Sequence, residues 1–470
     1  MVRFKFPTAY TILFFLIIFM AALTWIIPAG QYEMVQNAEL GREVPVAGTF
    51  HYIESNRQGI IDVLKAPING FYDSSTNQAN AVDVAIFVLI IGAFIAVTTK
   101  SGALDAGINR SIASLKGREK WIIPILMGLF AIGGTTYGMA EETLAFYAVL
   151  IPVMIAAGYD ALTGVAIVMV GAGIGVLGST INPFSTVIAA DAAGIDFIEG
   201  IWLRVIILVV GWAICTVYVM RYAAKVKRDP SASLVADLKE SNEKHFLGHE
   251  HTTKQIPKLT GQRKIILLIF CLTFIILIYG VTSLGWWMAE MGALFLGATI
   301  IIGLIARMNE EELTGTIVDG ARDLLGVAII IALARGIVVI MDEGNITPTI
   351  LHAAELGIKD MSEFAFINGV YWLEMLMSLV VPSSSGQAVL TMPIIAPLSD
   401  FAGVDRSLVV TAFQSACGLP NLITPTSGVV MGGLVLGRVS YGRWFKFMWP
   451  LLLMLIVLVT VVLNVGILLG

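Results

Sequence analysis

The sequence predicts an all-α, polytopic membrane protein in which two repeats have opposite topology. Composition is the first reason: 57% of the 470 residues are hydrophobic and 13% are charged, with a mean hydropathy of +0.85. Several apolar runs exceed the roughly 18 residues with which a helix crosses a bilayer. The second reason is a pair of interrupted apolar segments in each half of the chain. The third is the distribution of lysine and arginine.

The second half shows the interruptions most clearly. V-P-S-S-S-G-Q starts at residue 381 and G-L-P-N-L-I-T-P-T-S-G starts at residue 418, each inside apolar sequence. Unpaired backbone groups in a bilayer cost on the order of several kcal/mol each, so broken helices are tolerated there where they line a cavity. We expect a re-entrant hairpin over 362–401 and a broken transmembrane span over 404–436.

The first half repeats this pattern. G-G-T-T-Y-G starts at residue 133 and G-S-T-I-N-P-F-S-T starts at residue 178, which predicts a hairpin over 121–158 and a broken span over 161–191. Pro152 precedes Asn182 by 30 residues, and Pro393 precedes Asn421 by 28. The two halves therefore resemble one duplicated unit, and paired interrupted segments indicate the binding site of a carrier.

Positive charge sets the expected orientation of the first half. Arg3 and Lys5 place the N-terminus in the cytoplasm, the first loop is acidic, and a basic cluster follows the second span. The expected elements besides the hairpin and broken span are a span over 10–28, an outside loop over 30–80, a span over 81–99, an interfacial helix over 104–115 and a span over 201–219.

A connector over 221–264 separates the halves, and its ten Lys or Arg place it in the cytoplasm. It contains His245, His249 and His251. A His-x-His pattern near a glutamate is able to bind a metal, but we interpret this one as part of a solvated loop and assign no metal to it.

The second half is expected to be inverted, because one linking span over 265–284 joins the two repeats. Its other spans are predicted over 286–305, 327–340 and 447–469, which leaves the C-terminus outside, in the periplasm or extracellular space. The predicted boundaries are 1–221 for the first repeat, 222–285 for the connector with its linking span, and 286–470 for the second repeat.

Five motifs resemble those of a known family: Phe6-Pro7-Thr8-Ala9-Tyr10, Gly134-Thr135-Thr136-Tyr137-Gly138-Met139-Ala140-Glu141-Glu142, Thr180-Ile181-Asn182-Pro183-Phe184, Pro382-Ser383-Ser384-Ser385-Gly386 and Asn421-Leu422-Ile423-Thr424-Pro425. The chain resembles the ion-transporter superfamily, and within it most nearly the anaerobic dicarboxylate carrier (DcuC) family with its YfcC-like proteins.

The resemblance implies a homodimer in the bacterial inner membrane, with a scaffold domain and a transport domain made of the hairpins and broken spans. It implies an elevator movement that carries a small organic anion or amino acid with Na⁺ or H⁺. Related dicarboxylate symporters have Ser-Asn-Thr motifs at the hairpin tips. Here the tips read Gly134-Thr135-Thr136 and Ser383-Ser384-Ser385, so the resemblance does not give the cation stoichiometry.

Hydroxyl and amide side chains at the interruptions are the candidate substrate ligands, because they are able to replace the hydration of a carboxylate beside a helix N-terminus. They are Thr135, Thr136, Ser179, Thr180, Asn182, Ser383, Ser384, Ser385, Asn421, Thr424 and Thr426. Thr180, Asn182, Asn421 and Thr424 are also candidate ligands of a coupling Na⁺; no other cofactor is expected. The alternative is that these residues cap and pack helix ends.

Four charged residues in apolar sequence are candidates for charge or proton coupling: Glu141, Glu142, Glu374 and Arg335. Ionisable groups inside a membrane are costly and mark functional sites by default. For the adjacent glutamates, the roles are a proton relay or a partner for a cationic substrate group, and the alternative is a water-exposed mouth. Arg335 has either an ion pair within the fold or a contact with substrate. Arg204, near a span end, is expected to extend to the interface.

Three functions compete. A secondary transporter accounts for the duplication, the interruptions and the buried polar residues together, whereas a channel has no need of two inverted hairpins. An enzyme is not expected, since the sequence has no nucleophile elbow, His-Glu-x-x-His motif or nucleotide-binding glycine loop. The predicted partners are a small-molecule substrate, the lipid bilayer and a second copy of the chain, without nucleic acid. Two glutamates and no lysine or arginine at the tips favour an amino acid, basic ones included, over a dicarboxylate or short-chain carboxylate.

Overall fold

The computed structural model describes residues 9–37, 42–46, 48–74, 76, 79, 81–104, 106–107, 119–247, 259–286, 288–358, 361–381 and 383–469. Nearly all of its regular structure is helical. The first half contains α1 (Ala9–Leu23), α2 (Ile60–Asn69), α3 (Val82–Lys100), α5 (Ile122–Tyr137), α6 (Leu144–Ala156), α7 (Ala161–Leu177), α8 (Ile188–Ala193) and α9 (Ile201–Arg228).

The second half begins after α10 (Lys239–Leu247), which lies in the connector. It contains α11 (Gly261–Leu284), α12 (Met288–Ile305), α13 (Glu310–Glu343), α14 (Thr347–Ile358), α15 (Glu363–Val380), α16 (Ser384–Ala402), α17 (Arg406–Gly418), α18 (Gly428–Leu436) and α19 (Tyr441–Leu469). Most of the predicted interfacial helix over 104–115, together with His249 and His251, lies outside the described residues.

Two short strand pairs occur in the predicted outside loop. β1 (Gly30–Gln31) pairs antiparallel with β4 (His51–Tyr52), and β2 (Met34–Asn37) pairs antiparallel with β3 (Arg42–Pro45). The sequence did not predict them, because strands of this length leave no measurable alternation of apolar and polar residues.

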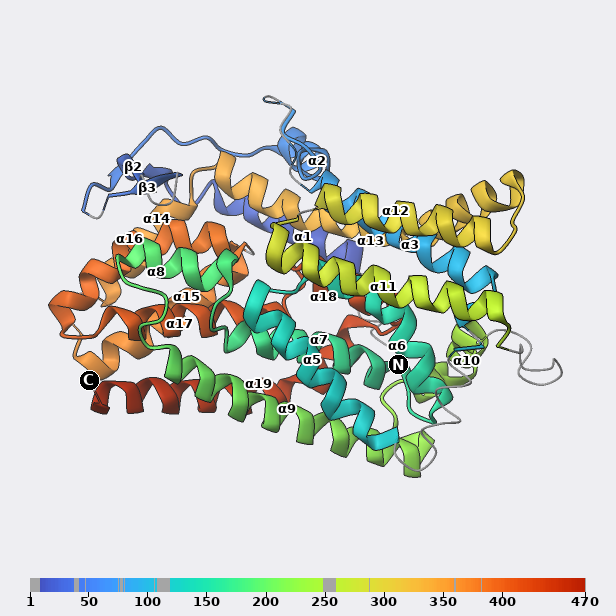
Figure 1. Ribbon diagram of the computed structural model, residues 1–470. Coiled ribbons are helices and arrows are strands. Elements are labelled where there is room, and N and C mark those ends of the chain that lie inside the picture. The colour runs from blue at the N-terminus through green and yellow to red at the C-terminus, as the bar shows by residue number, and fades with distance from the viewer. Residues whose placement is uncertain are drawn as a thin grey trace, which may run out of the picture.

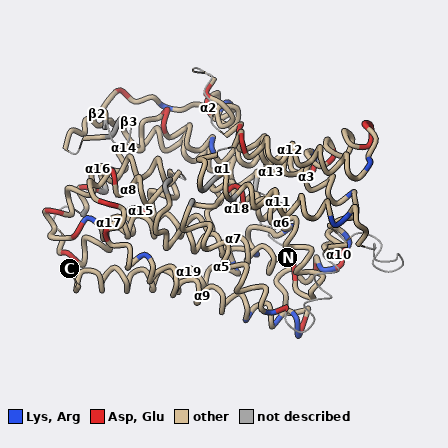
Figure 2. Tube along the Cα trace, viewed as in Figure 1, with Lys and Arg blue, Asp and Glu red and all other residues tan. Residues whose placement is uncertain are grey.

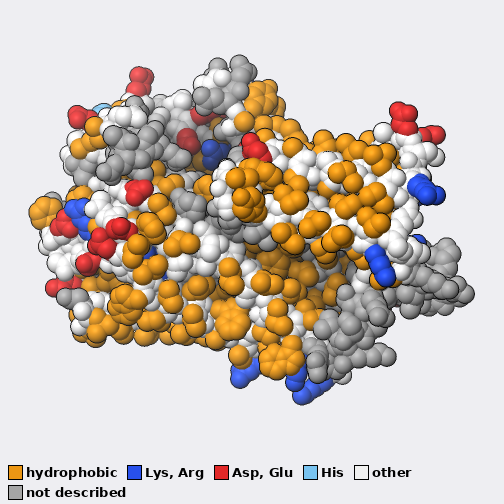
Figure 3. Space-filling model, in the orientation of Figure 1, with side chains coloured by type: hydrophobic (Ala, Val, Ile, Leu, Met, Phe, Trp, Pro, Cys, Tyr) orange, Lys and Arg blue, Asp and Glu red, His pale blue; other side chains and the backbone are white. Residues whose placement is uncertain are grey.

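Five helices in the described part of the chain are long and apolar enough to cross a membrane: α3, α9, α12, α13 and α19. The first predicted span is shorter than expected, since α1 ends at Leu23 and a series of turns follows before Pro28. A residue before proline is disfavoured in a helix, which is consistent with an early end. Hydrophobic side chains cover much of the visible face between the two ends of the molecule (Figure 3).

The molecule is elongated, and most helices run close to its long axis (Figure 1). One end holds the C-terminus with α14 and the β2–β3 pair, and the other end holds α10. Most charged residues lie toward these two ends, with a small group in the middle of the view (Figure 2). This is the charge distribution of a protein whose middle lies in hydrocarbon.

Helices are interrupted in all four predicted segments. α5 continues through the Gly133–Tyr137 stretch and ends at Gly138, whose φ of +74° lies in the left-handed region. α15 and α16 are separated by residues 381–383. Thr135, Thr136, Ser384 and Ser385 therefore lie in helical turns beside the tips, because the glycines and serines there do not stop a helix by themselves.

The two broken spans begin in the same way. Gly158 and Gly403 have φ of +86° and +73°. Two residues later, Asp160 caps the N-terminus of α7 through the Thr163 N–H, and Asp405 caps that of α17 through the Ser407 N–H. A left-handed glycine ends one helix and an aspartate cap starts the next, so each hairpin turns directly into its broken span.

Contacts in the first half have counterparts in the second. α5 packs on α7 and α9, and α15 packs on α17 and α19. α6 contacts α7 and α18, and α16 contacts α17 and α8. α3 packs against α13, and α9 against α19, so corresponding helices of the two halves contact each other.

Candidate substrate site at the crossing of two interrupted helices

The two interrupted helices α7 and α17 cross where both lack large side chains. A Cβ on Gly418 would lie 2.4 Å from Leu177 Cα, and one on Gly173 would lie 2.1 Å from Leu422 Cδ2. Small residues permit this approach of the two backbones. The crossing brings the first interruption, over 178–182, next to the end of α17.

Polar side chains join the two helices at this crossing. Thr186 Oγ1 is 2.9 Å from both Ser179 Oγ and Gln414 Oε1. Gln414 Nε2 donates to the Val176 carbonyl at 2.6 Å, and Ser415 Oγ donates to the Leu177 carbonyl at 3.2 Å. The backbone carbonyls freed at the end of α7 are therefore satisfied by α17. Thr186, Gln414 and Ser415 were missed by the sequence reasoning, although a glutamine inside an apolar helix is a usable signal.

The first hairpin tip is bonded to the first interruption. Thr135 Oγ1 lies 3.0 Å from Thr180 Oγ1 and accepts from the Thr180 N–H at 3.0 Å. Asn182 Oδ1 accepts from the Phe184 N–H at 2.9 Å, and its side chain lies against Gly138. Three predicted site residues, Thr135, Ser179 and Thr180, are thus brought together here, with Asn182 beside them.

The second interruption has fewer external partners. Thr424 Oγ1 and Thr426 Oγ1 are 2.7 Å apart and buried. Trp444 Nε1 of α19 donates to the Leu422 carbonyl at 2.9 Å, and Tyr441 Oη to the Ile423 carbonyl at 2.9 Å. Within the described residues, no hydrogen bond joins Thr424 or Asn421 to the first interruption, so the four candidate Na⁺ ligands form two separate pairs.

The remaining predicted hydroxyls have local partners. Ser383 caps the N-terminus of α16, because its Oγ accepts from the Gly386 N–H at 3.2 Å. The same Oγ lies 3.3 Å from Ser385 Oγ. Ser384 is the first residue of α16 and is partly exposed. Thr136 Oγ1 donates to the Ile132 carbonyl at 2.7 Å within its own helix.

α18 packs against helices that lie next to three of the charged candidates, Glu141, Glu142 and Arg335. Leu144, two residues after Glu142, lies 3.2 Å from the position of a Cβ on Gly432. On the other side, Ile331 of α13 lies 2.9 Å from a Cβ on Gly428. Glu142 is buried and Glu141 is partly exposed. Glu142 Oε2 accepts from the Ala140 N–H at 3.1 Å.

Arg335 lies one helical turn beyond Ile331 on α13, on the same face, because residues four apart are neighbours on a helix. Since Val327 and Ile331 contact Gly432 and Gly428 in turn, Arg335 lies on the face of α13 that packs against α18. Arg335 is partly buried and has no ion pair within 4.0 Å among the described residues. Its electrostatic partner is Asp342, seven residues further along the same helix.

Two other buried ionisable side chains have polar partners. Glu374 is fully buried on α15, and its Oε2 accepts from Gln387 Nε2 at 2.7 Å. Arg204 is also fully buried, contrary to the expectation that it extends to the interface. Its guanidinium donates to the carbonyls of Phe197 and Glu199, which turns the side chain inward.

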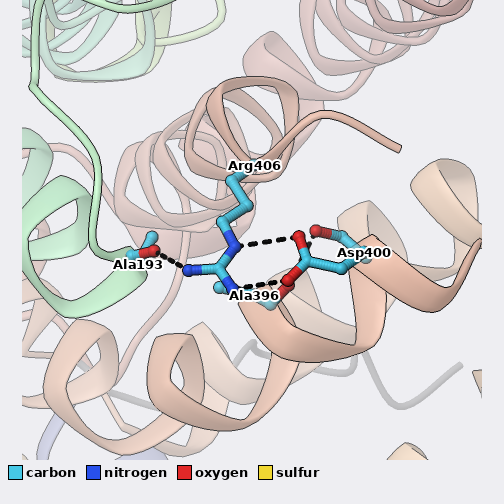
Figure 4. Close-up of polar contacts among 5 residues, drawn as sticks. Ala193, Ala396, Asp400 and Arg406 are labelled. Atoms are coloured by element: carbon cyan, nitrogen blue, oxygen red, sulfur yellow. Dashed lines mark hydrogen bonds and ion pairs between the residues drawn. The ribbon is translucent and has the colours of Figure 1, made fainter. Parts of the chain in front are cut away.

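An arginine ties the two halves together at the C-terminal end. Arg406 Nε donates to Asp400 Oδ1 at 2.9 Å, and its Nη1 donates to the Ala193 carbonyl at 2.6 Å (Figure 4). Asp400 lies on α16 and Ala193 is the last residue of α8. The end of the first broken span is therefore fixed to the second hairpin.

Comparisons with known proteins agree on one family. The family model described as C4-dicarboxylate anaerobic carrier, DcuC, matches residues 6–468. An uncharacterized protein of Haemophilus influenzae is 35% identical over 502 aligned positions, which cover 98% of this chain and 97% of that protein. The Escherichia coli K12 protein named "Putative basic amino acid antiporter YfcC" is 28% identical over 494 positions, with 98% and 96% covered.

Two solved structures are similar at a low level. One is Neisseria gonorrhoeae MtrF, from a class of antimetabolite efflux pumps, with 15% identity and a TM-score of 0.42 over 98% of this chain and 95% of that one. The other is the Alcanivorax borkumensis YdaH transporter, with 15% identity and a TM-score of 0.40 over 98% of each chain. At these scores, no residue role or motion is transferred to this chain.

Proposed function

Because the chain belongs to the C4-dicarboxylate anaerobic carrier family, and is therefore a multi-pass membrane transporter, we propose that it is a secondary active carrier of a small carboxylate-bearing metabolite. The carrying observation is that α18, which follows the second interruption, packs against α13 on one side and on the other against α6, which follows the first hairpin tip. Arg335 on α13 and the two glutamates just before α6 thus lie on segments that contact the same short helix.

The proposed substrate is an amino acid, and a basic one in particular. Arg335 has no ion-pair partner among the described residues and suits the substrate carboxylate. Glu141 and Glu142 suit an ammonium or guanidinium group, because a charge-assisted hydrogen bond is the strong way to hold a desolvated cation. The name of the Escherichia coli relative, a putative basic amino acid antiporter, supports the same substrate class.

A second candidate is a dicarboxylate or a short-chain carboxylate. The description of the family favours it, and Arg335, which has no ion pair within 4.0 Å among the described residues, would serve one carboxylate equally well. The two glutamates at the first tip oppose it, since like charges in a water-poor site repel strongly.

The proposal includes an elevator movement of the hairpins and broken spans in a homodimer of the bacterial inner membrane, with cytoplasmic N-terminus and periplasmic or extracellular C-terminus. The matched contacts of the two halves support two inverted repeats, bounded at 1–221 and 286–470 around the connector. In such carriers, substrate sites lie near the bilayer midplane where the repeats meet.

A thermal-shift screen of the purified protein tests the substrate class. Arginine, lysine, neutral amino acids, acetate and succinate are added separately, because a true ligand stabilises the folded state by mass action. The proposal expects stabilisation by arginine or lysine that is lost in Arg335→Met and reduced in Glu142→Gln. Stabilisation by succinate alone would favour the second candidate.

A further inference from the structure

The buried carboxyl group of Glu374 lies where the two arms of the second hairpin, α15 and α16, meet the second broken span at α17. Glu374 on α15 accepts from Gln387 Nε2 of α16 at 2.7 Å, and the same nitrogen donates to the Glu374 carbonyl at 2.8 Å. Cys417 Sγ of α17 donates to Gln387 Oε1 at 3.3 Å. Glu374 Oε1 has no hydrogen-bond partner among the described residues. The side-chain amide of Gln387 on α16 therefore contacts both of the neighbouring helices: its nitrogen bonds to Glu374 of α15, and its oxygen to Cys417 of α17.

Among the described residues, no lysine, arginine or histidine forms an ion pair with this carboxyl group. In the described part of the chain, α14, α16, α17 and α19, which pack against α15, bring no Lys, Arg or His within 4.0 Å of Glu374. The titratable group that faces it is the buried thiol of Cys417, and the hydroxyl of Thr391 is occupied by the Gln387 carbonyl at 3.0 Å. An ionised carboxylate that is buried without a cation is costly enough that the group takes up a proton instead.

We propose that Glu374 binds the coupling proton of the carrier and that Gln387 positions its carboxyl group. The proposal rests on the proposed carrier function and names H⁺ as the coupling ion. When the carboxyl group is protonated, the two hairpin arms close against α17 around Gln387. The proton leaves the carboxyl oxygen for water, so the hairpin must separate from α17 to hydrate the carboxylate that remains. Closure of the second hairpin thus requires the proton.

The glutamates of the first tip are a useful contrast. Glu142 Oε2 accepts from the backbone N–H of Ala140, two residues earlier in the same segment, at 3.1 Å. The hydrogen bond of Glu374 instead crosses from one arm of its hairpin to the other. A change in the charge of Glu374 therefore acts directly on the packing of the hairpin arms, which a change at Glu142 does not.

Infrared difference spectroscopy of the full-length protein at neutral pH tests the protonation directly. The proposal expects the carbonyl stretching band of a protonated carboxylic acid in the wild type, its loss in Glu374→Gln and its retention in Glu142→Gln. An unchanged band in Glu374→Gln overturns the proposal. If Glu374→Gln does not fold, Gln387→Met serves instead: removing the donor must shift the frequency of the band, and an unshifted band overturns the positioning role.

Transport in proteoliposomes supplies the second readout, with labelled arginine and labelled succinate as probes. Glu374→Gln is expected to lose accumulation driven by a pH gradient but to keep exchange of labelled for unlabelled probe, because exchange needs no net proton movement. Gln387→Met is expected to move the pH of half-maximal uptake upward, since the carboxylate loses its stabilising donor. Normal pH-driven accumulation in Glu374→Gln overturns the proposal. If the wild type accumulates neither probe, the proposed substrates fail while the infrared result still decides the protonation.

Discussion

The two interrupted helices start alike and differ at their breaks. Asp160 and Asp405 cap them after equivalent left-handed glycines. The first break is held from both sides, by Thr135 of its own hairpin and by Gln414 of the other half. The hydroxyls at the second break bond mainly to each other. The first break is thus a joint held by side chains of both halves, whereas the hydroxyls of the second break are the ones that we propose for a substrate.

The turns that lead into α7 and α17 also differ in their hydrogen-bond partners. Asp160 accepts from Tyr222 Oη and Ser233 Oγ at 2.6 Å each, so the connector is fastened to the first turn. The second turn is instead fastened to α8 through Arg406. The two equivalent turns therefore have the same backbone conformation but different polar partners.

The largest effect is expected where the two helices cross. Gly418→Ala places a Cβ 2.4 Å from a backbone atom of Leu177, and overpacking of this kind costs about 1–3 kcal/mol or more. We expect most of the folded protein to be lost, as measured by the monodisperse fraction in size-exclusion chromatography. Gly297→Ala on α12 is the matched control, because a Cβ there meets nothing within 4 Å. Equal recovery of the two variants would contradict the crossing.

Gln414→Leu tests the joint at the first break. It removes two buried hydrogen bonds, to the Val176 carbonyl and from the Thr186 hydroxyl, each of which contributes about 0.5–1.5 kcal/mol. The melting temperature should fall and transport should be lost. The control is Thr411→Val on the same helix, whose hydroxyl bonds only to the Ser407 carbonyl one turn earlier. A Gln414→Leu protein as stable as this control would show that the joint is not held by side chains.

Asn182→Ala and Asn421→Ala separate the two breaks. Asn182 caps the segment after the first break through the Phe184 N–H, and loss of a cap costs typically about 1 kcal/mol. Asn182→Ala should therefore lower both the melting temperature and transport. Asn421→Ala should lower transport alone, because its amide has no hydrogen bond among the described residues. If Asn421→Ala transports like the wild type, the second break does not bind substrate.

The smallest effect is expected at the connector. Arg443 donates to Asp237 Oδ2 at 2.6 Å and holds the pKa of that carboxyl group below its usual range. A depressed pKa stabilises the fold above the ordinary value of about 4, and this contribution is lost as the pH falls through the folded-state pKa. For so exposed a pair, Asp237→Asn should lower stability by at most about 1 kcal/mol at pH 7.

The control for this pair is the pH series itself. The difference in melting temperature between the wild type and Asp237→Asn should shrink as the pH falls below about 4. It should vanish once the pH lies below the depressed folded-state pKa of Asp237, where that side chain is protonated. A constant difference between the two proteins across that range would assign the effect to packing instead of charge.

Much of the helical layout was predictable from the sequence, because long apolar runs and paired glycine, proline and serine clusters leave strong local signals. The ranges of α3, α12 and the two hairpins lie close to those expected. The residues that join the halves were not predictable. Gln414, Thr186 and Gln387 depend on which helices meet across more than 200 positions or across a hairpin, and a single sequence does not contain that information. The candidate site residues were predicted from their residue type and their place at a helix break. That information identifies polar side chains but does not show which residues they contact.

The account is tested most directly by counterflow in proteoliposomes. Vesicles are loaded with unlabelled arginine or succinate, and the uptake of the same labelled compound is followed in the wild type, Asn421→Ala, Arg335→Met and the control Thr411→Val. The account predicts a transient overshoot in the wild type and Thr411→Val. It predicts the loss of this overshoot in Asn421→Ala and Arg335→Met, with melting temperatures near that of the wild type. An equal overshoot in all four proteins, or a non-saturating flux without overshoot, would contradict a carrier whose substrate lies between Arg335 and the second break.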